Sequence, residues 1–186
     1  MSYNGFTFNS QHSDNFKIVM LSVDRTLLPA KRREAYTIPG RSGNYYDKTD
    51  ADYDNRQIKV QISFRGEEPS LESLRKQIRL IAKWLSANEA PLIFDDEPDK
   101  AYTASIDAGL SLTQLAKWGQ CELTFNCQPF AESVQYLTET KDMTENNDSL
   151  AVNISGTQDT PCIITIKNIG TTDITGITVQ RKAGRA

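Results

Sequence analysis

The strongest constraint on the fold is a strict alternation of apolar and polar residues in two separate stretches of the chain. Every second residue is apolar from Ile58 to Phe64, and the same holds from Cys121 to Cys127. Because successive side chains of a strand point to opposite faces, each stretch predicts a β-strand with one buried face and one wet face. A chain with two such strands must fold around a sheet.

A second constraint is a single amphipathic helix. Pro69 and Ser70 supply a breaker and a capping hydroxyl, and the residues after them predict a helix over 70–87. Its apolar stripe recurs at steps of three and four and consists of Leu71, Leu74, Ile78, Ile81 and Leu85. Burying one aliphatic side chain contributes roughly 1.5–3 kcal/mol, so we expect the stripe to pack on the sheet. The alternative, a coiled-coil seam, requires about three or four heptads, and the stripe is shorter.

The remaining short apolar stretches also favour β-structure. We expect a strand near residues 6–8, a strand buried on both faces at 18–23, and strands at 90–94 and 102–106, joined by an acidic turn. Residues 36–65 are typical of a long β-hairpin that contains the turn sequence 38–43. The predicted fold class is therefore α+β and mainly β: a β-sandwich with one packed helix and a long protruding hairpin.

The composition shifts after Ala131. Residues 132–150 are polar and acidic and predict a linker, and residues 151–186 contain three short β-branched stretches at 151–154, 161–166 and 174–179. Three short strands make a poor independent domain. We therefore expect a domain over 1–131, a linker, and a partial or shortened C-terminal β-domain over 151–186.

Charge and hydropathy exclude several classes of function. The 186 residues carry a formal net charge of -3, which gives no general attraction to nucleic acid or anionic membranes. No apolar run approaches the roughly 20 residues of a membrane-spanning helix, and residues 1–5 do not resemble a signal peptide. We expect no membrane association.

The candidate chemical groups favour structural roles. The single histidine, His12, lies in a polar turn without a nucleophile motif, so a turn histidine is favoured over a general base. The run Asp95-Asp96-Glu97 lacks the alternate spacing and glycine of a calcium loop and reads as a solvated turn. The run 31–33 is basic and is more typical of a salt-bridged surface than of a phosphate site. The two-glycine turn 40–43 lacks the Gly-Lys-Ser/Thr ending of a nucleotide loop.

The three cysteines complete this inventory. Cys121, Cys127 and Cys162 are odd in number and match no zinc spacing, so we expect buried, reduced thiols without a disulfide or metal. The sequence thus offers no catalytic constellation and predicts a non-enzymatic protein without cofactors.

Five features in order resemble the N-terminal domain of the siphophage distal tail protein family. They are the opening Phe6-Thr7-Phe8-Asn9 with Ser13-Asp14-Asn15-Phe16, the turn Ile38-Pro39-Gly40-Arg41-Ser42-Gly43, the helix at 70–87, Pro91-Leu92-Ile93-Phe94-Asp95-Asp96-Glu97-Pro98 with Tyr102, and the strand Cys121–Cys127 followed by Gln128-Pro129-Phe130. The resemblance spans residues 1–131. In the family, a β-sandwich with a helix and a projecting hairpin forms a hexameric ring around a lumen wide enough for DNA, and a galectin-like domain usually follows.

The resemblance implies a structural virion protein at the tail tip, assembled in the bacterial cytoplasm, that joins the tail tube to the baseplate and lets DNA pass. The implied partners are further copies of the chain in a homohexamer, the tail tube protein, a tail-tip hub or tail-associated protein, the tape measure protein and a receptor-binding protein. DNA would be a partner only in transit, and the acidic loops predict a neutral to acidic lumen. The implied contact residues between subunits are Ile38, Pro39, Gly40, Arg41, Tyr45 and Tyr46.

A second function class stays open at this point. It is a carbohydrate- or receptor-binding β-sandwich of a phage tail fibre or adhesin. A ring-forming hub should assemble without ligand, whereas an adhesin should present exposed aromatics around a polar pocket.

Overall fold

The computed structural model describes residues 5–46, 52–64, 71–106, 120–145, 148–154, 156–158, 160 and 162–180. The chain divides into two compact units, Met1–Leu137 and Thr138–Ala186, which are treated separately below. The first unit holds every helix and strand assigned among these residues.

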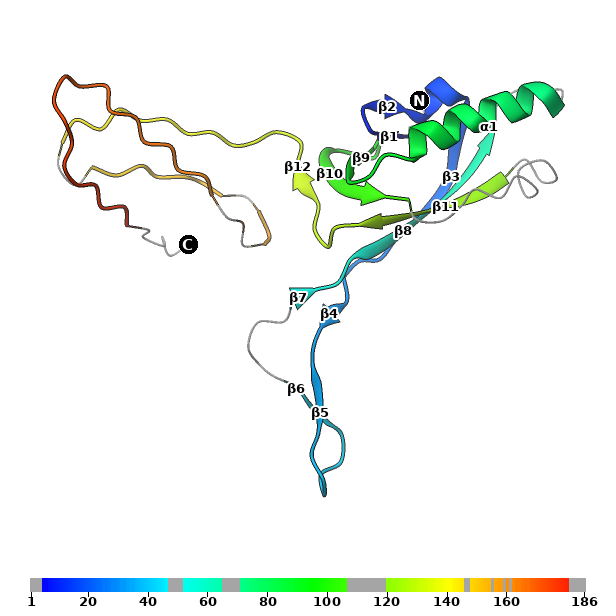
Figure 1. The fold of residues 1–186 in the computed structure, drawn as a ribbon, viewed down its shortest axis with the longest axis horizontal. Coiled ribbons are helices and arrows are strands. Elements are labelled where there is room, and N and C mark those ends of the chain that lie inside the picture. Colours follow the sequence, from blue (N-terminus) through cyan, green and yellow to red (C-terminus); the bar gives the residue numbers. More distant parts are fainter. Residues whose placement is uncertain are drawn as a thin grey trace. The chain divides into compact units, whose positions relative to one another are not determined.

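The first unit has two parts, which we call the head and the stalk (Figure 1). The head contains the strands β1 (Phe6–Phe8), β2 (Gln11–His12), β3 (Ile18–Arg25), β8 (Arg56–Phe64), β9 (Ala90–Phe94), β10 (Glu97–Ser105), β11 (Gln120–Cys127) and β12 (Glu132–Ser133). It also contains the short 3₁₀ helix η1 (Ser13–Phe16) and the α-helix α1 (Leu71–Leu85). The stalk contains β4 (Lys31–Arg32), β5 (Ala35–Thr37), β6 (Asn44–Tyr46) and β7 (Asp52–Tyr53).

The head is built on one antiparallel sheet with the strand order β2-β1-β9-β10-β11-β8-β3, and β12 pairs with β10. The sheet curls strongly. Phe6 and Phe8 of β1 lie with ring centroids 5.6 and 5.4 Å from that of Phe125 in β11, although β9 and β10 separate the two strands along the sheet. Two halves of the curled sheet therefore face each other across the core, and the predicted mainly β fold with one helix is confirmed.

Both alternating stretches are strands that face this core. β8 buries Ile58, Val60 and Ile62, and β11 buries Cys121, Leu123, Phe125 and Cys127. The two strands pair in register from Gln120 opposite Ser63 to Cys127 opposite Arg56. Their period-two pattern thus sets which face of the sheet lies inside.

The strand β3 differs from the prediction of a strand buried on both faces. It stands at the end of the strand order, where its one partner among the described strands is β8, and its register shifts between Met20 and Ser22. Ile18 and Met20 are buried, whereas Leu21 at the irregularity is 47% exposed. The prediction was wrong because the apolar run contains a bulge at the edge of the sheet, where a continuous apolar stretch need not be covered on both sides.

The helix α1 begins and ends within two residues of the predicted range 70–87. Ile81 and Leu85 are buried and Ile78 packs against the core, while Ser70 and the side chains of Leu71 and Leu74 lie outside the described residues. Trp84, which the predicted stripe omitted, is buried and contacts β1 and η1. Its indole stacks on Phe16 at 4.3 Å and on Phe6 at 5.7 Å, and its Nε1 donates a hydrogen bond of 2.7 Å to the Phe8 carbonyl.

The hairpin predicted over 36–65 has different strand partners in the structure. The stretch 58–64 pairs with β3 and β11 inside the head and is not an arm of the hairpin. The projecting hairpin instead pairs β4 with β7 and β5 with β6, and Figure 1 shows it leaving the head as a continuation of β3 and β8. The prediction paired the stretch 58–64 with the stretch that precedes it in the sequence. In the structure, β8 pairs instead with β3, which offers it a longer strand edge.

The second unit carries no assigned helix or strand among its described residues up to 180. Apolar side chains there stay exposed, with Ile154 at 69% and Ile163 at 96%. The described residues of the three predicted β-stretches therefore form no strand with a paired neighbour. So few short strands bury too little apolar surface to hold together without further strands.

Candidate interaction surface

The base of the stalk is held by backbone and side-chain contacts. The Asp54 N–H donates to the Ala30 carbonyl at 2.8 Å, and Arg32 Nε lies 2.9 Å from an Asp54 carboxylate oxygen. Tyr53 meets Phe130 edge-on, with ring centroids 5.0 Å apart, and Lys31 Nζ lies 5.5 Å from the centre of the Tyr53 ring. These contacts fix the direction in which the stalk leaves the head.

The outer part of the stalk is closed by a tight turn. The Arg41 N–H donates to the Ile38 carbonyl at 3.1 Å, which makes 38–41 a β-turn with Pro39 in second place. Gly40 in third place has φ +82. A type II turn requires such a positive φ at this place, and residues other than glycine rarely adopt it. The turn motif seen in the sequence therefore has a conformational reason.

Aromatic side chains occupy both faces of the stalk. Tyr36 lies directly opposite Tyr45, and Ala35 lies opposite Tyr46. Because adjacent residues of a strand point to opposite faces, Tyr36 and Tyr45 share one face and Tyr46 takes the other. A single partner surface on one side would thus leave an aromatic group uncovered.

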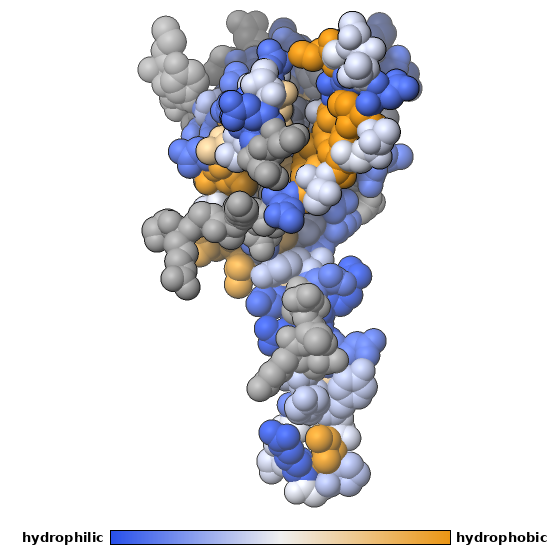
Figure 2. Space-filling model, turned by 90° about the vertical axis from the view of Figure 1, so that its left-hand side faces the viewer, coloured by the Kyte–Doolittle hydropathy of each residue, from blue (hydrophilic) through white to orange (hydrophobic). Residues whose placement is uncertain are grey.

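No residue from Ala30 to Tyr46 is buried. The exposed fractions are 49% for Tyr36, 42% for Ile38 and Tyr45, and 44% for Tyr46. Figure 2 shows the stalk as mostly hydrophilic with a hydrophobic spot near its far end. The structure places the predicted contact residues Ile38, Pro39, Gly40, Arg41, Tyr45 and Tyr46 together in this outer part, so they form one surface, which we call the stalk tip.

The basic run of the sequence lies on the first arm of the stalk. Arg32 forms an ion pair with Asp54 and Lys31 lies near the Tyr53 ring, as a salt-bridged surface would require. Within the described part of the chain, Arg33 and Arg41 form no ion pair. Arginine and tyrosine are the residue types that concentrate binding energy in protein interfaces.

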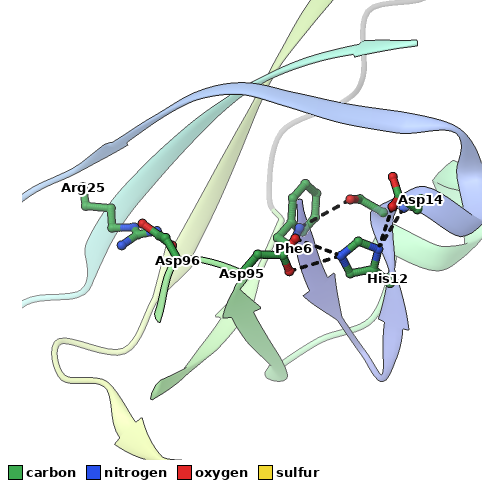
Figure 3. A network of polar contacts seen from close by, with 7 residues as sticks. Phe6, His12, Asp14, Arg25, Asp95 and Asp96 are labelled. Carbon is green, nitrogen blue, oxygen red and sulfur yellow. Dashed lines mark hydrogen bonds and ion pairs between the residues drawn. The ribbon is translucent and has the colours of Figure 1, made fainter. Parts of the chain in front are cut away.

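His12 has a partner that its sequence context did not reveal. Its Nε2 lies 3.2 Å from an oxygen of Asp95, 83 positions away, and its Nδ1 accepts a hydrogen bond of 3.2 Å from the Asp14 backbone N–H (Figure 3). Nδ1 acts as acceptor, so the ring proton lies on Nε2 and is donated to Asp95. Both ring nitrogens are thus engaged, which leaves none to activate a nucleophile. His12 was predicted to lie in a turn, but it is the last residue of the strand β2 and caps the 3₁₀ helix η1.

The acidic turn between β9 and β10 is bound from two sides. Asp95 accepts from His12, while the Arg25 guanidinium of β3 lies 2.6 Å from Asp96 and 3.7 Å from Glu97 (Figure 3). The same guanidinium lies 4.2 Å from the centre of the Phe94 ring. Arg25 therefore joins the end of the sheet at β3 to the turn that follows β9. The predicted solvated turn keeps Asp96 exposed and is also tied to the sheet by this ion pair.

The cysteines fall into two environments. Cys121 and Cys127 are buried, and burial raises both thiol pKa values, that of Cys127 to about 12. Cys162 is exposed, which corrects the prediction that all three thiols are buried. The correction follows from the second unit, where no sheet covers the stretch around it. A thiol with a raised pKa is a poor nucleophile at neutral pH.

Two other kinds of site are absent from the described residues. They contain no group of three or more His, Cys, Asp or Glu side chains placed to hold a metal ion. They also contain no helix long and apolar enough to cross a membrane.

Comparison with known proteins identifies the class to which this fold belongs. Residues 12–127 match the family model of the phage tail protein RIFT-related domain. The match covers more than half of the chain, so the chain belongs to this family of phage tail proteins. It is a non-enzymatic structural component of a phage tail. Comparison with curated proteins gives no match.

A solved structure shares the fold. The chain is similar to the crystal structure of the Dit (distal tail) protein of phage SPP1, which is described as a paradigm of the hub adsorption apparatus of phages that infect Gram-positive bacteria. The two share 19% sequence identity at a TM-score of 0.55. The match covers 67% of this chain and 49% of the SPP1 protein, so this chain spans about half the length of that relative.

Proposed function

We propose that the chain forms a closed homohexameric ring at the tail tip, which joins the tail tube to the baseplate and lets DNA pass through its lumen. The observation that carries this proposal is the stalk. It extends from a packed head, has no buried residue from Ala30 to Tyr46, and presents aromatic groups on both faces. An isolated hairpin of this kind is marginally stable in water, and its free edges invite aggregation.

A ring removes both problems at once. When each copy inserts its stalk tip against the next copy, the contact is heterologous, and closure leaves no free surface of this type. A stable contact of this kind buries on the order of 1,000 Å² or more. Tyr36, Tyr45 and Tyr46 are the anchors that we expect at its centre.

The further partners follow from this placement. The tail tube protein and a tail-tip hub or tail-associated protein would stack on the two faces of the ring, with the tape measure protein and a receptor-binding protein as further contacts. DNA would touch the ring only in transit. The net charge of -3 supports a neutral to acidic lumen, because a basic lumen would release counterions and retain the duplex.

The second unit fits the start of a further β-domain. Its exposed apolar residues, such as Ile163 and Ile169, are those that additional strands would cover. We expect residues 132–150 to connect the ring to this domain.

Native mass spectrometry of the purified chain tests the proposal. We expect a single assembly with the mass of six chains, stable on dilution and formed without ligand. A monomer at high protein concentration would contradict the ring. Duplex-DNA binding by the assembled ring, at physiological salt and micromolar affinity or tighter, would contradict the proposed lumen charge.

A further inference from the structure

The outer face of α1 is a basic surface that the contacts of the head leave open. The helix contains four basic residues, Arg75, Lys76, Arg79 and Lys83, and one acidic residue, Glu72. All four basic side chains are exposed, and three of them follow each other at steps of four, so they share one face. The whole chain has a net charge of -3, whereas this face of the helix is positively charged.

This basic face is largely without internal partners. Lys76 pairs with Glu72 at 2.9 Å, one turn away. Among the residues that the structure describes, Arg75, Arg79 and Lys83 form no ion pair. Leu80, at the rim of the same face, is 60% exposed.

A segment of opposite character lies elsewhere in the same sequence. Residues 132–145 contain four acidic side chains, Glu132, Glu139, Asp142 and Glu145, and one basic side chain, Lys141. All fourteen residues of this acidic segment are exposed, among them Tyr136 at 86% and Leu137 at 64%. Lys141 forms an ion pair with Asp148, so it does not neutralise the four acidic side chains of the segment.

The two surfaces complement each other in charge and in apolar groups. We propose that the acidic segment 132–145 of one copy docks on the basic face of α1 in the next copy. This contact would add to that of the stalk tip, and it rests on the proposed ring. Each copy would give one segment and receive another, which is the form of a closing heterologous contact.

The apolar groups favour this protein partner over nucleic acid. Phosphate backbones are bound by basic and hydrogen-bonding groups and need no apolar centre, whereas protein contacts combine an apolar centre with a polar rim. Leu80 on the helix and Tyr136 and Leu137 on the segment supply apolar groups on both sides.

A charge-swap series tests the inference on the full chain. The first variant combines Arg75→Glu with Arg79→Glu, and the second combines Glu139→Lys with Asp142→Lys. In each variant alone, like charges face each other and repel, so the protein concentration at which half of the chains are assembled should rise about tenfold. The combination of all four substitutions brings opposite charges together again and should restore assembly. Higher salt screens these charges, so it should reduce the difference in assembly between the variants and wild type. The control combines Lys17→Glu with Lys59→Glu. It lowers the net charge by the same amount as the first variant and should leave assembly unchanged.

Cross-linking identifies which copy provides the segment. A mixture of wild-type chains with light and heavy nitrogen, treated with a carbodiimide, should join Lys76 or Lys83 to Glu139 or Asp142 in peptides of mixed isotope. Links within one isotope only would overturn docking between copies. Variants that assemble like wild type would overturn it too, as would loss of DNA binding as the sole effect of Arg75→Glu with Arg79→Glu. If wild type assembles and the charge-swap variants assemble equally well, the ring stands and the docking falls. If wild type stays monomeric, both fall.

Discussion

The head and the stalk solve opposite physical problems with the same type of strand. In the head, β8 lies between β3 and β11 and buries Ile58, Val60 and Ile62, and α1 packs on the core through Trp84. In the stalk, the antiparallel pair β5–β6 buries nothing and exposes tyrosines on both faces. The head is therefore stabilised by its own contacts, whereas the side chains of the stalk can be buried only by a partner.

The largest expected effect separates the two regions by stability. Trp84→Ala removes three ring contacts, with Phe6, Phe8 and Phe16, and the hydrogen bond to the Phe8 carbonyl, so it should lower the free energy of unfolding by about 3–5 kcal/mol. Urea denaturation followed by circular dichroism measures this. The control Leu80→Ala, on the exposed side of the same helix, should stay within about 0.5 kcal/mol of wild type. Equal effects of the two would show that α1 does not close the core.

A smaller effect is expected at the glycine beside the acidic turn. A Cβ on Gly5 would lie 2.7 Å from an Asp95 oxygen and 2.8 Å from the His12 ring, so Gly5→Ala must displace at least one of these two side chains. The free energy of unfolding should fall by about 1–3 kcal/mol. At Gly40 a Cβ meets nothing within 4 Å, so Gly40→Ala should strain only the turn and leave the unfolding of the head unchanged. A head that is insensitive to Gly5→Ala would contradict the tie between His12 and Asp95.

Thiol chemistry sharpens the contrast between covered and uncovered chain. At pH 8, iodoacetamide should modify Cys162 within minutes and leave Cys121 and Cys127 unmodified until urea unfolds the head, and the denatured chain should then show three modified thiols. The folded pKa of Cys127, about 12, lies above the ordinary 9.0, so the neutral thiol stabilises the head below pH 9 and this contribution is lost as the pH rises towards 12. Fast native modification of Cys127, or a mass that shows a disulfide, would contradict this.

The smallest effect on stability is expected at the stalk tip. Tyr45→Ala combined with Tyr46→Ala should change the free energy of unfolding of the head by less than about 0.5 kcal/mol, because neither ring is part of the core. The same variant should lose ring assembly in sedimentation velocity, since aromatic anchors dominate such contacts. Leu21→Ala, another exposed apolar residue of the first unit, is the control and should assemble normally.

The sequence predicted elements better than it predicted their partners. Alternation from Ile58 to Phe64 and from Cys121 to Cys127 identified buried faces, because a period of two depends only on neighbouring residues. It did not identify β3 as the partner of β8, since strand pairing is decided by edges far apart in the chain. For the same reason His12 and Asp95 could not be joined from the sequence.

Trp84 shows a further limit, whereas the turn and the tyrosines of the stalk were readable. Trp84 follows Ile81 by three positions, so the helical period alone would have included it in the stripe; a stripe counted only in aliphatic residues missed it. At the tip, the turn was readable because Pro39 and Gly40 have fixed conformational preferences. The exposure of Tyr45 and Tyr46 was expected from the projecting hairpin, and both side chains are about half exposed in the structure.

The central claim is that the stalk joins neighbouring copies, and shortening it tests this most directly. Residues 33–51 would be replaced by Asn-Gly, a two-residue turn that connects Arg32 to Asp52, which face each other at the stalk base. The account predicts a head that melts within a few degrees of wild type and a native mass equal to one chain. A shortened chain that still has the native mass of the wild-type ring would contradict it.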